Sequence, residues 1–271
     1  MGHPQIATFA RMAKDSTAPN RVIAGQATKL SRTMHDIRYD PVNDEILVTN
    51  PFANAILVFR GSAQGDEAPI RIIQGRKTLI GDVDRLDVDP INDEIYIPNR
   101  DVSTVLVFPR KANGDVAPIR ILGGNDTQLG RSVASVSVDP VHNLLVVAHN
   151  SRDGIVIFNR TANGNAQPRT VVKGPKSGIV RINQIALNPQ RRLVVAAQPG
   201  VGSEMEPEGA FVGVWSYDDN GDAPPRWKIN AGTSSTLKKP RGVVLNPKHK
   251  EIIVADMRLN AVLTFYFPEI F

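Results

Sequence analysis

The sequence contains no cysteine, and aromatic residues make up only 6% of its 271 positions. Without cysteine there is no disulfide, no thiolate metal site and no cysteine nucleophile. Few aromatic residues argue against sugar or base stacking as the main mode of binding. No apolar run reaches the roughly 18 residues of a membrane span, and residues 1–14 lack the apolar core of a signal peptide. We therefore expect a soluble chain without these chemistries.

The chain is basic, with 32 Lys and Arg residues against 27 Asp and Glu, a net charge of +5 and a pI near 9.6. Such an excess can indicate binding to nucleic acid or to an anionic surface. Here the positive residues are spread along the whole chain, which argues against a nucleic-acid partner. The 21 glycines and 20 prolines are typical of a globular fold rich in turns.

An internal repeat organises the whole sequence. Five Asp-Pro or Asn-Pro dipeptides mark it, with spacings of 49, 50, 49 and 58 residues, and they begin at Asp40, Asp89, Asp139, Asn188 and Asn246. A period in this range predicts a solenoid or a propeller. Proline presets φ in a turn, and the Asp or Asn side chain caps the backbone of that turn. Each dipeptide is therefore expected to end a short first strand.

Three further strands complete each repeat. The second strand is rich in branched apolar residues, as in 45–49 and 144–148, and the third carries an aromatic residue at a fixed position. We expect these aromatic residues to pack between neighbouring blades; they are Phe59, Phe108, Phe158, Trp215 and Phe265. A Gly-Asp or Gly-Asn loop and a fourth strand ending at glycine follow. Four antiparallel strands per repeat predict an all-β, five-bladed β-propeller in a single domain.

The expected blades cover residues 26–75, 76–124, 125–174, 175–232 and 233–271. The last lacks a fourth strand, and residues 18–25 match the fourth strand of the first repeat. We expect strand 18–25 to join the C-terminal blade and so close the ring, which removes an open sheet edge. Residues 6–11 look like a further third strand and compete with 262–267 for one place. Because 262–267 follows its own second strand, we expect it to take that place and the N-terminal copy to be displaced, frayed or used in an oligomer contact.

Polar side chains are expected at one mouth of the central channel. Strands alternate in direction, so the start of each first strand and the end of each second strand lie at the same mouth. The first-strand positions are His35, Asp84, Ala134, Asn183 and Arg241, and the second-strand positions are Asn50, Asn99, His149, Gln198 and Asp256. A ring of polar groups suits a small polar ligand or a hard cation. Asn and Asp at strand ends also cap turns, which is the alternative interpretation.

Capping favours the same residue type in every repeat, so residues that break the symmetry are the stronger candidates. These are His149, His35, Asp84, Arg241 and Asp256. A histidine beside a carboxylate can act as a general base near neutral pH. A divalent cation, the one cofactor considered, would have mixed oxygen and nitrogen ligands in Asp84, Asp256, Asn50, Asn99 and His149. No His-x-x-x-His or His-Glu-x-x-His motif supports either arrangement.

The longest spacing between repeats reflects an insertion at 200–209, between the second and third strands of the fourth repeat. The insertion is bounded by glycine, is acidic in a basic chain and faces the same mouth. Such a segment suits a lid or a partner-binding loop, and equally an inert, solvated loop. Together with two polar residues of the mouth, its glutamates form the candidate ligand-binding set: Asn183, Gln198, Glu204, Glu206 and Glu208.

Several segments share one motif pattern that covers essentially the whole chain: Val48-Thr49-Asn50, Val58-Phe59-Arg60, the run Phe-Asn-Arg-Thr-Ala-Asn-Gly at 158–164 and the run Ala-Pro-Ile-Arg-Ile-Leu-Gly-Gly at 117–124. This pattern resembles the NHL-type β-propeller repeats of bacterial, in particular extracellular, proteins. The resemblance implies a propeller and favours a secreted or periplasmic location. Its recurring residues are turn and packing residues, so it implies a fold rather than a function. Related six-bladed propellers include metal-dependent lactonases, whose ligand set does not map onto this chain.

Two classes of function follow from these patterns. The first is a propeller that binds a small polar ligand or a protein partner at the polar channel mouth. The alternative is a metal-assisted hydrolase, lactonase or lyase that acts at the same mouth. A purely structural role is a third interpretation, because the opposite face carries repeated Gly-Asp and Gly-Asn loops without individual features.

Overall fold

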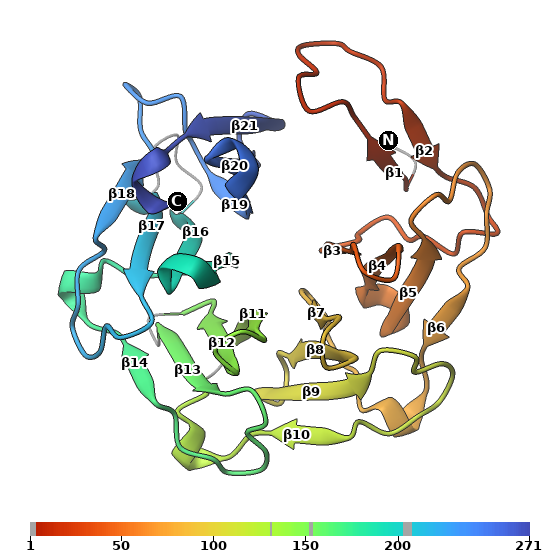
Figure 1. The fold of residues 1–271 in the computed structure, drawn as a ribbon, viewed down its shortest axis with the longest axis horizontal. Coiled ribbons are helices and arrows are strands. Elements are labelled where there is room, and N and C mark those ends of the chain that lie inside the picture. The colour runs from red at the N-terminus through yellow and green to blue at the C-terminus, as the bar shows by residue number, and fades with distance from the viewer. Residues whose placement is uncertain (1–3, 131, 152–153, 203–207) are drawn as a thin grey trace.

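The computed structural model describes residues 4–130, 132–151, 154–202 and 208–271. These residues form five antiparallel sheets that stand as blades around a central axis (Figure 1). The predicted five-bladed β-propeller is therefore confirmed. Helix is limited to short 3-10 turns, and none in the described ranges is long and apolar enough to cross a membrane.

The first four blades have four strands each, in the meander order that the repeat predicts. Blade 1 contains β3 (Ile37–Asp40), β4 (Glu45–Asn50), β5 (Ala55–Arg60) and β6 (Arg71–Ile73). Blade 2 contains β7 (Asp87–Asp89), β8 (Glu94–Asn99), β9 (Thr104–Pro109) and β10 (Arg120–Leu122). Blade 3 contains β11 (Val133–Asp139), β12 (Leu144–His149), β13 (Ile155–Asn159) and β14 (Thr170–Val172). Blade 4 contains β15 (Gln184–Asn188), β16 (Leu193–Val201), β17 (Glu208–Ser216) and β18 (Trp227–Asn230).

The fifth sheet and the N-terminal segment complete the chain. Blade 5 consists of β19 (Pro240–Asn246), β20 (Glu251–Asp256) and β21 (Ala261–Tyr266). The N-terminal hairpin is a separate sheet and consists of β1 (Ile6–Thr8) and β2 (Arg21–Ile23). The 3-10 turns are η1 (Pro51–Ala53), η2 (Arg76–Thr78), η3 (Asn125–Thr127), η4 (Pro175–Ser177), η5 (Pro189–Arg191), η6 (Pro247–His249) and η7 (Pro268–Ile270).

The Asp-Pro dipeptides act as the sequence predicts. The buried Asp40 carboxylate accepts hydrogen bonds from the backbone N–H groups of Val42 and Asn43, at 3.0 and 3.1 Å. Asp89 and Asp139 repeat this arrangement at the same place in the next two blades. Each carboxylate satisfies backbone donors that the turn leaves unpaired, and this fixes the hairpin between first and second strands.

The aromatic residues of the third strands pack between blades, as predicted. Phe59, Phe108 and Phe158 are fully buried, and Trp215 is 1% exposed. Phe108 of blade 2, for example, belongs to an apolar cluster that includes Leu47 and Ile56 of blade 1. Neighbouring blades therefore share one continuous apolar interface, to which each ring contributes a large buried area.

The fourth strands of blades 1 to 3, and β2 of the N-terminal hairpin, are each attached to the following blade by a repeated contact. The fourth strand ends at a glycine with positive φ, and the side chain of an Asp or Asn from the neighbouring Gly-Asp or Gly-Asn loop lies against that glycine. We call these Asp and Asn residues the clasp residues. They are Asp66, Asp115, Asn165 and Asp222, and each accepts a hydrogen bond of 2.7 Å from a backbone N–H just after the glycine. The repetition of these loops thus has a structural cause.

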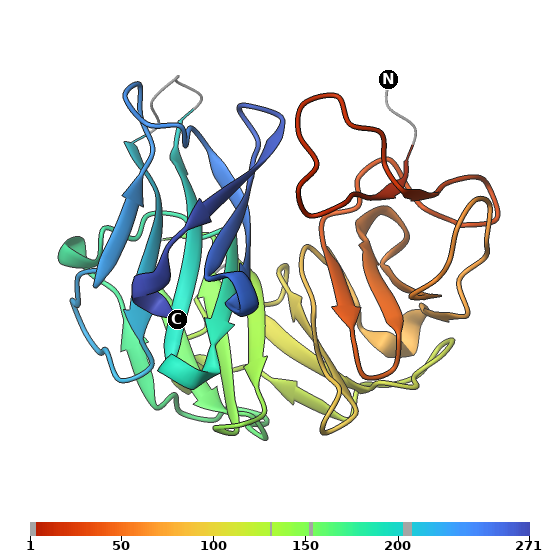
Figure 2. The same ribbon diagram turned by 45° about the horizontal axis from the view of Figure 1, so that its top comes forward.

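The predicted ring closure is wrong. Strand 18–25 does not join the C-terminal blade, because its β2 pairs with β1 in the register Ile6↔Ile23 and Thr8↔Arg21. The segment at 6–11 thus takes the place that was expected for 262–267. A hairpin between β1 and β2 closes a short loop, whereas pairing with β21 joins the two ends of the chain, which costs more entropy. Figures 1 and 2 show the ring open between β21 and this hairpin.

The opening leaves one inner position of blade 1 uncovered. Ile37 on β3 is 46% exposed, whereas its counterparts in the other four blades are at most 1% exposed; they are Leu86, Val136, Ile185 and Val243. The outer half of the same face is covered, since Ile23 of β2 packs with Val48 and Phe59. The N-terminal hairpin therefore covers blade 1 only along its outer half.

Candidate ligand site in the central channel

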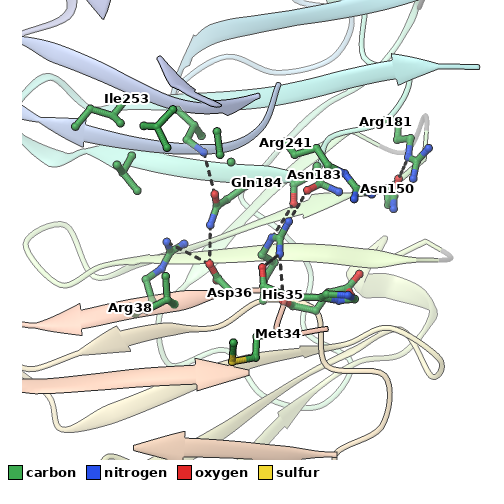
Figure 3. A pocket seen from close by; sticks show the side chains of 18 of the residues that line it. Met34, His35, Asp36, Arg38, Asn150, Arg181, Asn183, Gln184, Arg241 and Ile253 are labelled. Atoms are coloured by element: carbon green, nitrogen blue, oxygen red, sulfur yellow. Dashed lines mark hydrogen bonds and ion pairs between the residues drawn. The ribbon is translucent and has the colours of Figure 1, made fainter. Parts of the chain in front are cut away.

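A cavity of about 530 Å³ lies on the central channel and is lined mainly by the starts of first strands (Figure 3). Four of the five predicted first-strand positions line this cavity: His35, Asp84, Asn183 and Arg241. Arg85, which directly follows Asp84, also lines the cavity. Three further arginines reach it from β3 and from two loops, namely Arg38, Arg100 and Arg181. On one side the wall is apolar and belongs to blade 5, where Val244, Ile253 and Val262 line it.

His35 and Asp84 form a pair across the interface of blades 1 and 2. The ring nitrogen Nδ1 of His35 is hydrogen-bonded to Oδ1 of Asp84, and Arg100 donates to Oδ2 at 3.1 Å. Burial acts to raise the pKa of Asp84, but the hydrogen bond to His35 and the charges of His35 and Arg100 outweigh it and lower that pKa. The structure thus holds an ionised carboxylate beside an imidazole at the cavity wall.

The lowered pKa of Asp84 makes its contribution to stability depend on pH. We expect Asp84→Asn to reduce the free energy of unfolding at pH 7 by on the order of 1 kcal/mol. A depressed folded-state pKa stabilises the protein above the unfolded value near 3.9, and this contribution is lost as the pH falls through the folded value. The difference between wild type and variant should therefore shrink between about pH 5 and pH 2. Urea unfolding across this range measures it, with Asp82→Asn as control; a difference that does not change with pH contradicts the prediction.

Arg85 connects three blades across the channel. Its guanidinium Nη1 donates to the carbonyl oxygen of His35 and Nη2 to Oδ1 of Asn183, while Nε lies 3.3 Å from the carbonyl oxygen of Asn183. These bonds join blade 2 to blades 1 and 4, and the side chain is buried. Arg85 therefore fixes the position of two predicted site residues.

Gln184 makes a second connection, on the side nearer the opening. Its Nε2 donates to Oδ1 of Asp36 at 2.8 Å, and its Oε1 accepts from the backbone N–H of Val243 at 2.9 Å (Figure 3). One amide side chain thus links blade 4 to blades 1 and 5. Asp36 also accepts from the backbone N–H of Leu86 at 3.1 Å and lies 3.8 Å from Arg38.

Sequence reasoning missed Arg85, Asp36 and Gln184. All three occupy the position directly after the candidate first-strand position. That position reads Asp36, Arg85, Ser135, Gln184 and Gly242 along the five repeats, so it differs between repeats as strongly as the position before it. The same comparison, extended by one residue, finds them.

Arg241 is the arginine whose charge is least compensated in the cavity. Within the described residues its side chain makes no hydrogen bond or ion pair. The charge of Asp84 is near enough to act toward a higher pKa of Arg241, but other effects outweigh it. Burial, followed by the charges of Arg181 and Arg85, lowers the pKa of Arg241. Arg181 itself is held by Asn150, whose Oδ1 accepts from its Nε at 2.6 Å. Five arginines and two aspartates line the cavity, so it has an excess of positive charge.

The predicted second-strand positions do not join this cavity, and most of them cap loops. Asn50 and Asn99 donate to the carbonyl oxygens of Lys29 and Leu79, at 3.0 and 2.7 Å. Gln198 accepts from the backbone N–H of Val180, and Asp256 from those of Lys238 and Lys239. His149 is fully buried and does not line the cavity. For Asn50, Asn99, Gln198 and Asp256 the contacts are those of the capping interpretation, although the residue type differs between repeats.

The candidate cation ligands are therefore not brought together. Of the proposed set, Asp84 alone lines the cavity, and among the described residues no three His, Asp or Glu side chains converge in a way that could hold a metal ion. Of the acidic insertion, Glu204 and Glu206 lie outside the described residues, and Glu208 is described only as the first backbone position of β17.

The fold places the chain among the β-propellers, and comparison with known proteins agrees. No protein-family model matches the chain, and no curated protein matches it in sequence. The chain is similar in structure to a chain of the hydrazine synthase of Kuenenia stuttgartiensis, with a TM-score of 0.60 and 14% sequence identity. The match covers 91% of this chain and 58% of that one. At this identity the likeness concerns the fold alone, and the resemblance to NHL-type repeats stays a prediction.

Proposed function

We propose that this protein binds a small anionic ligand, one with a carboxylate or phosphate group, in the channel cavity. The observation that carries the proposal is the position of Arg241, whose side chain is exposed and lines the cavity beside two further arginines, without a bonded counter-ion among the described residues. The positive charges of Arg241, Arg181 and Arg85 repel one another at this cavity, so an anion that pairs with them gains both Coulomb energy and hydrogen bonds.

The donors of the cavity suit such a group. A guanidinium offers a planar pair of N–H donors that matches the two oxygens of a carboxylate or phosphate. Arg181 and Arg85 are held in place by Asn150 and Asn183, so their orientation is fixed before a ligand arrives. The apolar wall of Val244 and Val262 on the opposite side suits the carbon skeleton of a small organic acid.

The alternative function, a hydrolase or lyase at the same mouth, has one supporting observation. His35 is hydrogen-bonded to Asp84 at the cavity wall and keeps 41% of its side chain exposed. An oriented imidazole next to an anion site is able to move a proton to or from a bound ligand. This second candidate requires turnover of a bound ligand that depends on His35.

The binding proposal predicts a selective effect of Arg241. We expect calorimetric titration to detect binding of inorganic phosphate, a dicarboxylate or a sugar phosphate, and not of the neutral sugar. Arg241→Gln should weaken the affinity at least about tenfold, since a charge-assisted bond contributes roughly 1.5–3 kcal/mol. Arg241→Lys keeps the charge without the planar fork and should fall between the two.

Arg191→Gln is the matched control for this experiment. It removes the same charge from an exposed residue of η5, which does not line the cavity. If no member of the panel binds the wild type, or if Arg191→Gln weakens binding as much as Arg241→Gln, the proposed anion site is wrong. Conversion of a ligand that stops in His35→Ala supports the second candidate.

A further inference from the structure

The outer edge of β21 is open in the described part of the chain. In blades 1 to 4 a fourth strand pairs with the outer edge of the third, whereas the fifth sheet ends at β21. The carbonyl oxygens of Val58, Val107, Ile157 and Val214 each accept a backbone hydrogen bond from the residue just before the fourth strand, at 2.7–2.8 Å. Their counterpart, Thr264, receives no such bond from the described residues. An edge of this kind can pair with another extended chain.

The side chains along β21 show the same deficit. Val262 is 70% exposed, although its counterparts Ile56, Val105, Ile155 and Val212 are at most 1% exposed. Each counterpart lies directly opposite a residue of the fourth strand, namely Ile73, Leu122, Val172 and Ile229. Val262 thus lacks a cross-strand aliphatic neighbour as well as a covering blade.

Charge also distinguishes this edge. In blades 1 and 2 an arginine of the fourth strand makes a two-bond ion pair with a glutamate at the start of the second strand. Arg71 binds Glu45, and Arg120 binds Glu94, with bonds of 2.7 and 2.8 Å in both pairs. Glu251 begins β20 at the corresponding position.

Glu251 already binds an arginine, although no fourth strand supplies it. Its partner is Arg11, which follows β1 and lies 2.6 Å away with a side chain that is 43% exposed. Arg11 is the counterpart of Arg110 and Arg160, which bind Glu45 and Glu94 in addition to the arginine of the fourth strand. Glu251 therefore lacks the second arginine, the one that a fourth strand supplies in blades 1 and 2.

We propose that the outer edge of β21 is a docking site for an extended strand of a partner protein, which carries an arginine followed two residues later by Ile, Leu or Val. In the register of blade 1 that arginine lies opposite Thr264, as Arg71 lies opposite Val58, and reaches Glu251. The aliphatic residue then lies opposite Val262 and covers it. Main-chain bonds supply affinity and the two side chains supply specificity, as in other strand additions.

The strand comes from another protein because this chain's own matching strand is in use. β2 has the required pattern, Arg21-Val22-Ile23, but one of its edges pairs with β1. On its other side Ile23 is bridged to Gly65, whose N–H donates to Val22 at 2.8 Å. A second copy of the chain has its β2 engaged in the same way.

A peptide with the sequence of residues 117–124, Ala-Pro-Ile-Arg-Ile-Leu-Gly-Gly, is the probe. We expect fluorescence anisotropy to show that the labelled peptide binds at least about tenfold more tightly than the same peptide with glutamate in place of arginine. Hydrogen exchange should slow at the amides of β21 when the arginine peptide is added. Glu251→Gln should remove the difference between the peptides. Glu269→Gln, an exposed control that forms no ion pair with any residue the structure describes, should keep it. Arg11→Ala should tighten binding, because it frees Glu251.

Three results overturn the proposal. Equal or absent binding of the two peptides shows that the edge has no arginine-dependent site. Amides of β21 that exchange as slowly as those of β5 in the peptide-free monomer show that the chain covers its own edge. Slow exchange that appears only at concentrations where light scattering detects a dimer shows that a second copy covers it. Far-ultraviolet circular dichroism of each variant confirms that it is folded.

Discussion

Phe108→Ala is expected to lower the free energy of unfolding by about 3–5 kcal/mol. The ring is fully buried, and it packs in the cluster that joins blade 2 to Leu47 and Ile56 of blade 1. Truncation removes its transfer free energy and leaves a cavity between two sheets that cannot move together, because the blades are already fixed to each other at their outer strands. Chemical denaturation followed by circular dichroism measures the loss.

Phe265→Ala is the matched control for Phe108→Ala. Phe265 occupies the same third-strand position in blade 5 and packs against an apolar cluster shared with blade 4, but it is only half-buried. We expect its loss to be clearly smaller, about 1–3 kcal/mol. If both substitutions destabilise equally, Phe265 is packed between blades 4 and 5 as tightly as Phe108 is between blades 1 and 2, and the expectation is wrong.

Gly75→Ala is expected to destabilise the protein by about 3 kcal/mol or more. Gly75 has φ +133°, a conformation that L-residues rarely adopt, and a Cβ at this position would lie 2.4 Å from the carboxylate of the clasp residue Asp115. That carboxylate also accepts the backbone N–H of Lys77, so it cannot turn away without loss of a hydrogen bond. Strain and steric overlap therefore add.

Gly114→Ala separates these two causes. Gly114 has φ +76°, and a Cβ there would meet nothing within 4 Å, so only the left-handed backbone contributes, at about 1–2 kcal/mol. The double variant of Gly75→Ala and Asp115→Ala should recover part of the loss, since the overlap is removed and the backbone strain stays. A cost of Gly75→Ala no greater than that of Gly114→Ala means that the clasp contact is not tight in solution.

The blades could be predicted because the repeat encodes them locally. Asp40 and its counterparts determine each first turn, and the third-strand aromatic residues determine the interface between blades. Each repeat therefore predicts the same blade structure without reference to the others. The mode of ring closure could not be predicted in this way. Residues 6–9, Ile-Ala-Thr-Phe, and 262–265, Val-Leu-Thr-Phe, are nearly equivalent candidates for the edge of β2. The two pairings differ in the length of the chain segment that each closes into a loop, and so in entropy. The repeat pattern carries no information on this difference.

The candidate site was predictable in part. The starts of the first strands converge on the axis, which brings His35, Asp84, Asn183 and Arg241 to one cavity. The ends of the second strands are followed by loops whose free backbone groups take up the polar side chains, so Asp256 and its counterparts cap instead of facing the channel. Which of the two a polar residue does depends on how many unpaired backbone groups lie beside it, and this is a property of the folded loop.

The clasp residues have a consequence for how the molecule opens. Each clasp couples only two neighbours, so along their outer strands the blades form a linear array in which nearest-neighbour contacts dominate, and Arg85, Gln184 and the ion pair of Arg11 with Glu251 add a few contacts between more distant blades. Blade 5 is a terminal unit, and among the described residues it supplies no clasp residue to blade 4. Partial unfolding should therefore begin there. Because β19 carries Arg241, loss of this one blade would dismantle the cavity while blades 1 to 4 stay folded, and a bound anion would in turn hold the terminal blade in place.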